Sequence, residues 1–394
     1  MRSGAEDHAR AEFVASLNWE HDMELLAPSE PGFAFRPAGP NEERLLAAGD
    51  AYSAALAYLN GRINIEGDIF AALRAWFARS ASGRAWLCMW LARLWRLWPE
   101  SLYQSRARAR ANVQFHYDHD PEFYRQFLDE NLVYSCAYFE RPDMTIDQAQ
   151  SAKLDYICRK LELQAGDRFL DVGCGFGALV MRAAQRFGAL AKGCTLSRGQ
   201  FQTAARVLRE RGMEHVVGIE LADYRDVAGP FDKIASVGMV EHVGVRRLYR
   251  YFSRISALLA PRGLFLNHGI TRPEDVEPGA EWLFLQRRVF PGGELPHLSE
   301  VVRAAGRAGF EVLDVENLRM HYARTCRLWV ERLLAREAAC RALVGSLIYR
   351  TWILYLAASA LSFEDGLTDV CQILLAKRSS PPPRQWTRAH LYST

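Results

Sequence analysis

From about residue 165 onward, short apolar runs alternate with segments whose apolar residues recur at helical spacing. The apolar runs predict strands at 168–173, 190–196, 216–222, 233–238, 263–270, 310–318 and 370–378. Helical patterns separate most of these runs, and two helical segments precede the last strand. Such alternation is typical of a doubly wound α/β sheet. We therefore expect a seven-stranded, Rossmann-like sheet.

The chain before residue 106 has a different pattern. Residues 57–80 fit a turn followed by an amphipathic helix, and residues 83–100 alternate Trp with Arg. The Trp/Arg segment fits either a packed helix or a helix at a membrane interface, and Trp on more than one helix face favours packing. We expect a small, mainly helical domain over 1–105 and a second domain over 106–394. A stretch rich in Pro and Gly, 271–297, is predicted to be an inserted lid.

Composition narrows the functional classes. The chain is 49% hydrophobic and 24% charged, and its net charge of +3 gives no reason to expect a nucleic-acid partner. None of the cysteines forms a CxxC pair, so neither a metal site nor a disulfide framework is expected. The N-terminus lacks the apolar stretch of a signal peptide, and Arg350 interrupts the most apolar segment, 342–363. We therefore expect a cytoplasmic protein with no transmembrane span.

Three glycines follow the first predicted strand of the sheet. Gly173, Gly175 and Gly177 form a GxGxG turn ahead of a helix, where bare backbone and a positive helix end suit a nucleotide-like ligand. A dinucleotide site would require an acid at the end of the next strand, but residues 195–197 contain none. The following strand ends in Asp223 and an aromatic residue, which suits an adenine ring, although Asp223 could equally cap a helix.

Several motifs, in a fixed order, point to a known family. They include YSCAYFERPDMT (134–145), LDVGCGFG (170–177), TLSRGQ (195–200), VGMVEHVG (237–244), NHGIT (267–271), HYARTCRLW (321–329) and DVCQ (369–372). From about Asn112 to Lys377 the chain resembles the cyclopropane-fatty-acid synthase and mycolic-acid methyltransferase family, which uses S-adenosylmethionine. The resemblance implies methyl transfer to a carbon–carbon double bond of a lipid acyl chain.

The resemblance also assigns site residues. Those expected to contact S-adenosylmethionine are Tyr134, Ser135, Asp171, Gly173, Gly175, Gly177, Thr195, Leu196, Gln200, Asp223 and Tyr224. Those expected to hold a bicarbonate ion are Cys136, Glu241, His268, Ile270 and Tyr322. Of these, Cys136 and Ile270 are expected to act through their backbone.

The chemistry sets three requirements. Methyl transfer to an alkene leaves a carbocation, so the site must exclude water, surround the cation with π faces or negative charge, and supply a base. Loss of a proton from the new methyl group closes a cyclopropane. A protein carboxylate could be the base, or the bicarbonate held by Glu241 and His268 with a hydrogen bond from Tyr322. The aromatic residues considered for the acyl tunnel are Tyr138, Phe139, Phe176, Trp282, Phe284 and Trp329.

The expected partners are unsaturated phospholipid acyl chains and, peripherally, the inner face of the membrane, with a homodimer as a candidate assembly. Alternative functions are a methyl-branched, methylene or hydroxylated product, a small-molecule methyltransferase, and an inactive lipid- or nucleotide-binding protein. One departure from the family is Ser359, where many relatives carry a cysteine. We interpret this position as packing.

Overall fold

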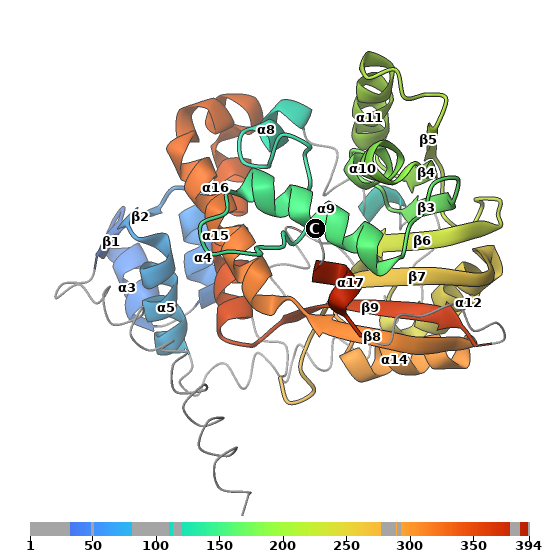
Figure 1. Ribbon diagram of the computed structural model, residues 1–394. Helices are drawn as coiled ribbons and strands as arrows, with labels where there is room; N and C mark the ends of the chain where they lie inside the picture. Colours follow the sequence, from blue (N-terminus) through green and yellow to red (C-terminus); the bar gives the residue numbers. More distant parts are fainter. Residues whose placement is uncertain are drawn as a thin grey trace, which may run out of the picture.

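A mixed seven-stranded sheet spans residues 168–377 and lies on the right of the view in Figure 1. The computed structural model describes residues 32–48, 51–80, 110–112, 120–276, 289, 293–378 and 387–392. The strands are β3 (Arg168–Val172), β4 (Leu190–Thr195), β5 (Val217–Leu221), β6 (Phe231–Val237), β7 (Leu259–Thr271), β8 (Phe310–Asn317) and β9 (Asp369–Lys377). Their order is β5-β4-β3-β6-β7-β9-β8, and β9 runs antiparallel to both its neighbours. The predicted doubly wound α/β fold is confirmed.

Helices cover both faces of this sheet. One face packs against α9 (Ile146–Lys160), α10 (Ala178–Phe187) and α11 (Arg198–Glu210). The other face packs against α12 (Leu248–Leu258) and α14 (Leu298–Arg307). Side chains alternate along a strand, so Phe169 and Asp171 point toward α9, whereas Leu170 and Val172 point toward α12. A polar residue of β3 thus lies beneath α9, where the candidate site forms.

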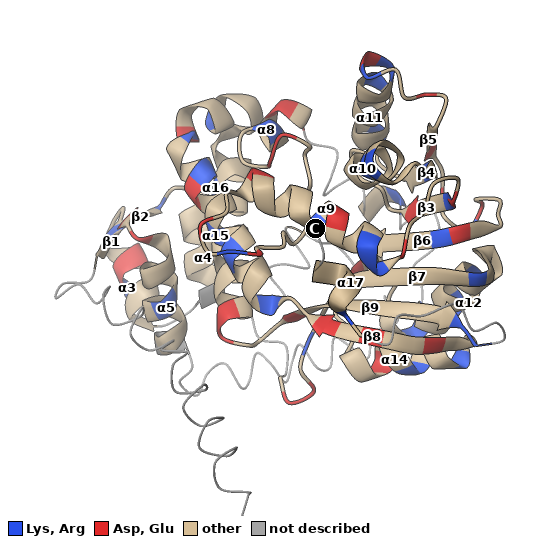
Figure 2. Cartoon of the chain, viewed as in Figure 1, with Lys and Arg blue, Asp and Glu red and all other residues tan. Residues whose placement is uncertain are grey.

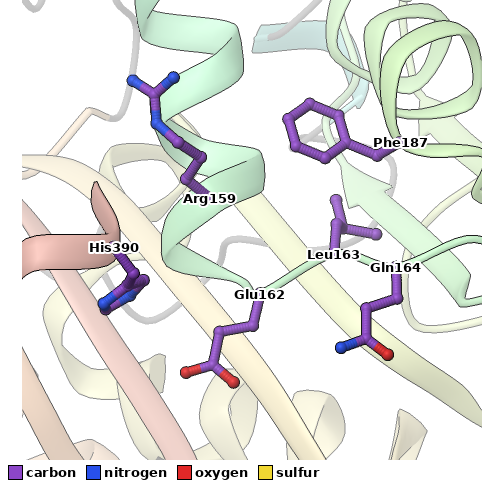
Figure 3. A pocket seen from close by; sticks show the side chains of 6 residues that line it. All are labelled: Arg159, Glu162, Leu163, Gln164, Phe187 and His390. Carbon is purple, nitrogen blue, oxygen red and sulfur yellow. The ribbon is translucent and has the colours of Figure 1, made fainter. Parts of the chain in front are cut away.

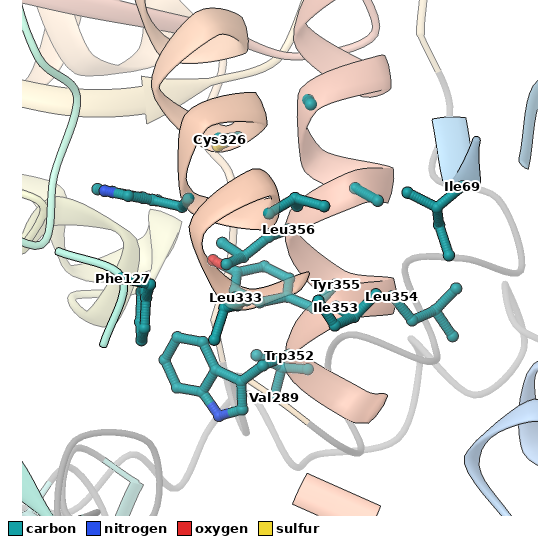
Figure 4. Close-up of a cluster of buried hydrophobic side chains, with 14 of the residues drawn as sticks. Ile69, Phe127, Val289, Cys326, Leu333, Trp352, Ile353, Leu354, Tyr355 and Leu356 are labelled. Atoms are coloured by element: carbon teal, nitrogen blue, oxygen red, sulfur yellow. The ribbon is translucent and has the colours of Figure 1, made fainter. Parts of the chain in front are cut away.

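A second layer of structure lies beside the sheet. It consists of α8 (Pro121–Arg125), α15 (Arg319–Ala335) and α16 (Glu337–Glu364). Among the described residues, these helices share the largest buried cluster with the N-terminal elements, and Figure 4 shows Trp352, Tyr355 and Leu333 in this cluster with Phe127 and Ile69. The carboxyl edge of the sheet therefore faces a continuous apolar body.

The N-terminal elements include a small sheet that the sequence pattern did not predict. The elements are β1 (Phe33–Pro37), α3 (Pro40–Ala48), α4 (Ala51–Leu59), β2 (Ile63–Gly67) and α5 (Ile69–Ser80). Strands β1 and β2 pair antiparallel. The predicted amphipathic helix is present as α5, and the predicted turn precedes β2.

α16 is long and apolar enough to cross a membrane by length and composition alone. In this fold its central residues are buried in the core, Trp352 among them. Arg350 is 7% exposed and donates hydrogen bonds to the carbonyls of Tyr58 and Ile63 and to Asn64 Oδ1, at 2.6, 2.7 and 2.7 Å. The arginine that interrupts the apolar run thus joins α16 to the N-terminal elements.

Some predicted features lie outside the described residues. They are the Trp/Arg segment 83–100, most of the basic run 105–112, the greater part of the predicted lid with Trp282 and Phe284, and the proline-rich tail. In the described part, basic and acidic positions are interspersed along the helices and strands (Figure 2).

Candidate active site

The glycine turn joins β3 to α10 at the carboxyl edge of the sheet. Gly173, Gly175 and Gly177 have φ values of 80°, 55° and 85°, a region that side chains rarely adopt. Gly177 is the N-cap of α10 and offers no capping side chain. Just before the turn, Asp171 is buried, and its Oδ1 has no hydrogen-bond partner among the described residues. Bare backbone, a helix N-terminus and an unpartnered carboxylate oxygen fit a polar, partly cationic ligand such as S-adenosylmethionine.

The end of β4 supplies a second group of predicted cofactor contacts. The Thr195 hydroxyl donates a hydrogen bond to Gln200 Oε1 at 2.8 Å, and both residues are buried. Leu196 lies between them, half-buried. This side-chain bond spans the connection between β4 and α11.

The end of β5 supplies the third group. Asp223 accepts hydrogen bonds from the backbone N–H and the guanidinium of Arg225. Tyr224 is half-buried and meets Tyr251 edge-on at 5.7 Å. No helix begins at Asp223 in the described chain, because residues 222–230 continue as a turn into β6. The alternative that Asp223 caps a helix is therefore wrong.

Residues 133–136 are held by two side chains of α9. Gln150 Nε2 donates to the carbonyls of Val133 and Ser135, at 3.2 and 2.8 Å. One turn later, the ammonium of Lys153 donates to Ser135 Oγ at 2.9 Å. Both α9 side chains are buried. Tyr134, between the two clamped residues, is thereby directed into the aromatic cluster of α15 and α16.

Four of the predicted bicarbonate residues converge through a few contacts. Glu241 lies in the short helix η2 (Val240–His242), and its Oε1 accepts a hydrogen bond from the N–H of Ile270 at 2.6 Å. The Leu318 carbonyl accepts both the N–H of Tyr322, at 3.1 Å, and the thiol of Cys136, at 3.8 Å. Burial raises the pKa of Tyr322, and the neighbouring Cys136 and Glu241 add to that effect.

His268, the fifth residue, lies on β7 two positions before Ile270. Its Nδ1 is 3.2 Å from Nε2 of Gln372, its cross-strand partner on β9. Burial lowers the pKa of His268 to about 3, and the ammonium groups of Lys153 and Lys160 lower it further. His268 is therefore a neutral imidazole at physiological pH.

Two polar atoms of this set are buried without a partner among the described residues. They are Glu241 Oε2 and His268 Nε2. Burial raises the pKa of Glu241 to about 7, against which the hydrogen bond from Ile270 acts. Because buried polar groups are normally hydrogen-bonded, these two atoms indicate a site for a small polar ligand.

The Cys136 side chain is inert in this setting. It is fully buried, it donates to the carbonyls of Ala137 and Leu318, and burial raises its thiol pKa. A thiol with a raised pKa is a poor nucleophile at neutral pH. A backbone role for Cys136 stays a prediction.

Aromatic rings crowd the space beside these groups. The ring of Tyr134 lies 5.2 Å from that of Trp329 and 5.5 Å from that of Trp352, and Tyr322 lies 6.2 Å from Trp329. Phe176, from the glycine turn, joins the same cluster. Trp329 and Phe176 were both predicted to line an acyl tunnel, whereas the pattern gave Trp352 no role.

The other two described tunnel candidates, Tyr138 and Phe139, both contact His321. Tyr138 stacks on Tyr156 at 4.2 Å and on His321 at 5.0 Å, and Phe139 also stacks on His321. Phe139 packs in a separate small cluster with Met144. Tyr138 nevertheless belongs to the same large buried cluster as Trp329 and Phe176. Whether Tyr138 and Phe139 line the tunnel stays a prediction.

A surface hollow of about 240 Å³ lies at the opposite edge of the sheet (Figure 3). It is lined by Arg159, Glu162, Leu163, Gln164, Phe187 and His390. His390 comes from the short helix α17 (Ala389–Tyr392), and residues 162–164 precede β3. The hollow is thus at the amino end of β3, and ligands of such sheets bind at the carboxyl ends.

Three buried polar residues of the site were given no role by the sequence. They are Gln150, Lys153 and Gln372, and only Gln372 falls within a quoted motif, DVCQ. Nothing in the sequence showed what the three contact. Gln150 and Lys153 are three residues apart on one face of α9, which is the spacing that brings two side chains onto the same neighbour. This spacing was the one feature of the sequence that could have predicted a shared contact for Gln150 and Lys153.

The sheet order, the glycine turn and the acid-free end of β4 together define the fold of an S-adenosylmethionine-dependent methyltransferase. Residues 104–373 match the family described as mycolic acid cyclopropane synthetase, and the chain belongs to that family. The resemblance drawn from the motifs is confirmed. The protein is a cyclopropane synthase-like, S-adenosylmethionine-dependent methyltransferase.

Individual relatives support this family assignment. A probable fatty acid methyltransferase of Pseudomonas putida is 40% identical over 346 residues, which cover 85% of each chain. Cyclopropane mycolic acid synthase 1 of Mycobacterium tuberculosis is 39% identical over 278 residues, covering 68% of this chain and 97% of the relative. The solved structure of mycolic acid cyclopropane synthase CmaA1 with SAH and CTAB superposes with a TM-score of 0.65 at 38% identity, covering 68% of this chain and 98% of that one.

Proposed function

We propose that the protein transfers a methyl group from S-adenosylmethionine to a cis double bond of an unsaturated phospholipid acyl chain and forms a cyclopropane. The relatives are named for fatty acid methylation and for cyclopropane synthesis on mycolic acids, which supports a long acyl substrate. The proposal includes peripheral contact with the cytoplasmic face of the membrane, where such chains are available.

One observation carries the proposal: a buried acceptor, Glu241 Oε2, and a buried imidazole nitrogen, His268 Nε2, both lack partners within the described part of the chain. Tyr322 lies near enough to Glu241 for that carboxylate to raise its pKa. Bicarbonate offers one O–H and several acceptor oxygens. Glu241 would accept the O–H, while His268 and Tyr322 would donate to the oxygens. A bicarbonate held in this way would supply the base for the new methyl group.

The aromatic cluster fits the second requirement of the reaction. Bound S-adenosylmethionine would supply the electrophilic methyl group. The rings of Tyr134, Trp329 and Trp352 would stabilise positive charge on the acyl chain through their π faces. The same rings exclude water, which would otherwise trap the cation.

The cofactor would be held at the carboxyl edge by the groups already described. The glycine turn and Asp171 would receive its polar end, and the side chains at the ends of β4 and β5 would receive the nucleoside. Ser135, held by the hydrogen bond from Lys153, would also contact the cofactor. Each contact depends on residues that the fold holds without the ligand.

The test is incubation of the full-length protein with methyl-labelled S-adenosylmethionine and vesicles of cis-monounsaturated phospholipid. We expect label in the lipid, loss of olefinic proton signals and gain of cyclopropane signals by NMR. Vesicles of saturated phospholipid are the control. Label on a product that keeps a double bond would assign methyl or methylene addition instead, and no label in any lipid would overturn the proposal.

Removal of bicarbonate tests the base. In buffer freed of carbon dioxide we expect turnover to fall by at least about 10-fold and to return when bicarbonate is added. Glu241→Gln is expected to be slow in both buffers, because it loses the acceptor for the ligand's O–H. Glu220→Gln, which removes an exposed carboxylate paired with Lys192, is the matched control.

A further inference from the structure

Gln372 and His268 face each other across two central strands. They form one cross-strand pair between β9 and β7, and both are buried, with exposures of 0% and 2%. Gln372 Nε2 lies 3.2 Å from His268 Nδ1. Neither side chain can leave this contact without entering the packed core, so the imidazole is fixed in orientation.

The contact also determines where the imidazole carries its hydrogen. In the amide orientation of this structure Gln372 Nε2 faces Nδ1 and donates to it, while Gln372 Oε1 is buried without a partner among the described residues. His268 is a neutral imidazole here, and its single ring hydrogen is then on Nε2. This is the buried nitrogen that has no partner among the described residues. The site therefore presents an N–H donor to whatever ligand occupies it.

The strand beyond Gln372 shows why an amide, not an acid, suits this position. Gln372 pairs on its other side with Glu316 of β8. The Glu316 carboxylate accepts hydrogen bonds from Lys160 Nζ at 2.5 Å and from Tyr156 Oη at 3.2 Å. Gln372 thus stands between this charged pair and the imidazole. A carboxylate in its place would accept a hydrogen from Nδ1 and leave Nε2 as an acceptor or form an imidazolium.

We propose that Gln372 is a positioning residue that holds His268 in the tautomer with hydrogen on Nε2, so that the imidazole donates to an anionic ligand beside Glu241 and Tyr322. The tautomer follows from the contact itself. Its effect on turnover rests on the proposed function, because a donor is useful only if an anion binds there.

The tautomer can be observed directly. Full-length protein labelled with ¹⁵N-histidine is studied by long-range ¹H–¹⁵N NMR, with His268→Gln identifying the signal. We expect an unprotonated Nδ1 and a protonated Nε2 in the natural protein. In Gln372→Glu we expect Nδ1 to become protonated. A protonated Nδ1 in the natural protein, or no change in Gln372→Glu, would overturn the inference.

Kinetics separate positioning from folding. We expect Gln372→Glu to lower kcat by at least about 10-fold with little change in KM for lipid. Gln148→Glu makes the same chemical change on the exposed side of α9 and is expected to leave kcat unchanged. Gln372→Leu, which lacks both amide groups, is expected to show a mixture of tautomers by NMR, and a single unchanged tautomer would contradict the inference.

The two proposals fail in different ways. If the natural protein shows the expected tautomer but methylates no lipid, the proposed function is wrong and the assignment to Gln372 stands. If lipid is methylated while Nδ1 carries the hydrogen, the assignment is wrong and the proposed function stands.

Discussion

Lys153 is a buried cation among buried acids. Its ammonium bonds Ser135, and the carboxylates of Asp129 and Asp171 are close enough to act on its pKa, which burial lowers to about 8. In Lys153→Met the clamp on Ser135 is lost and two buried carboxylates lose their counter-charge. We expect S-adenosylhomocysteine to bind about 10-fold more weakly and the protein to lose about 3 kcal/mol of stability. Calorimetric titration and urea unfolding measure the two effects.

Lys192→Met is the matched control for this prediction. Lys192 pairs with Glu220 near the surface, where an ion pair contributes at most about 1 kcal/mol. If both variants bound the cofactor product equally well, Lys153 would have no part in holding the cofactor segment.

Glu241 makes stability depend on pH. Burial raises the pKa of Glu241 from 4.5 in the unfolded chain to about 7 in the folded protein. The contribution of Glu241 to the free energy of unfolding is therefore fully present below pH 4.5 and is lost as pH rises through about 7. Relative to the natural protein, Glu241→Gln should gain stability between about pH 5 and about pH 8, by up to about 3 kcal/mol.

Thermal unfolding of both proteins across this range measures the difference. The pKa of His268 is lowered, so its contribution is lost as pH falls, but it is present in both proteins and cancels in the comparison. A stability difference that stays constant with pH would show that Glu241 does not titrate in this window.

The motifs predicted which residues lie in the site, but they did not predict the contacts that each of these residues makes. Cys136, Glu241, Ile270 and Tyr322 come from four distant segments, and the structure brings them together as the resemblance implied. The partner of His268 could not be predicted, because it depends on the register between β7 and β9. A sequence does not state register, and a shift of one residue would place Gln372 on the other face.

At the scale of elements, most strands of the central sheet were predictable because they are buried apolar runs between turn signals, although β5 and β8 are mainly half-buried or exposed. β2 was missed because it is short and mostly exposed, with the burial pattern of an edge pair. A helical segment was predicted before the last strand, where α16 lies, and Arg350 was the reason to expect no transmembrane span there. What that arginine contacts could not be predicted from the pattern.

Arg350→Met is expected to loosen the joint between α16 and the N-terminal elements. The change keeps the apolar stem but leaves the buried carbonyls of Tyr58 and Ile63 without their donor, whereas Asn64 is exposed and can bond water. We expect a loss of about 3 kcal/mol or more in urea unfolding.

Arg341→Met provides the comparison on the same helix. Arg341 pairs with Glu337 one turn away and is more than a third exposed. Its loss should cost about 0.5 kcal/mol or less. Equal losses in the two variants would mean that the buried hydrogen bonds of Arg350 contribute nothing beyond a surface pair.

For the whole molecule, the important feature is that one apolar cluster serves two purposes. It holds Trp76 and Ile69 of α5 together with Trp329 and Trp352, whose rings are proposed to face the acyl chain. Ion pairs from Arg74 to Glu364 and Asp365 reinforce the same contact. The N-terminal elements therefore pack against the aromatic residues that are proposed to contact the acyl chain. None of the N-terminal residues was predicted to be catalytic.

This arrangement predicts one cooperative unfolding transition in which the N-terminal elements and the acyl side of the site are lost together. Trp76→Ala should lower stability by about 3 to 5 kcal/mol, because it opens a cavity in the shared cluster. Leu190→Ala, at a half-exposed position on β4, should cost less than about 0.5 kcal/mol. In Trp76→Ala, lipid turnover should decline at the urea concentration where helical circular dichroism declines. We expect a single transition because residues packed in one cluster lose their contacts together. Two separate transitions would show that the N-terminal elements unfold independently of the acyl side of the site.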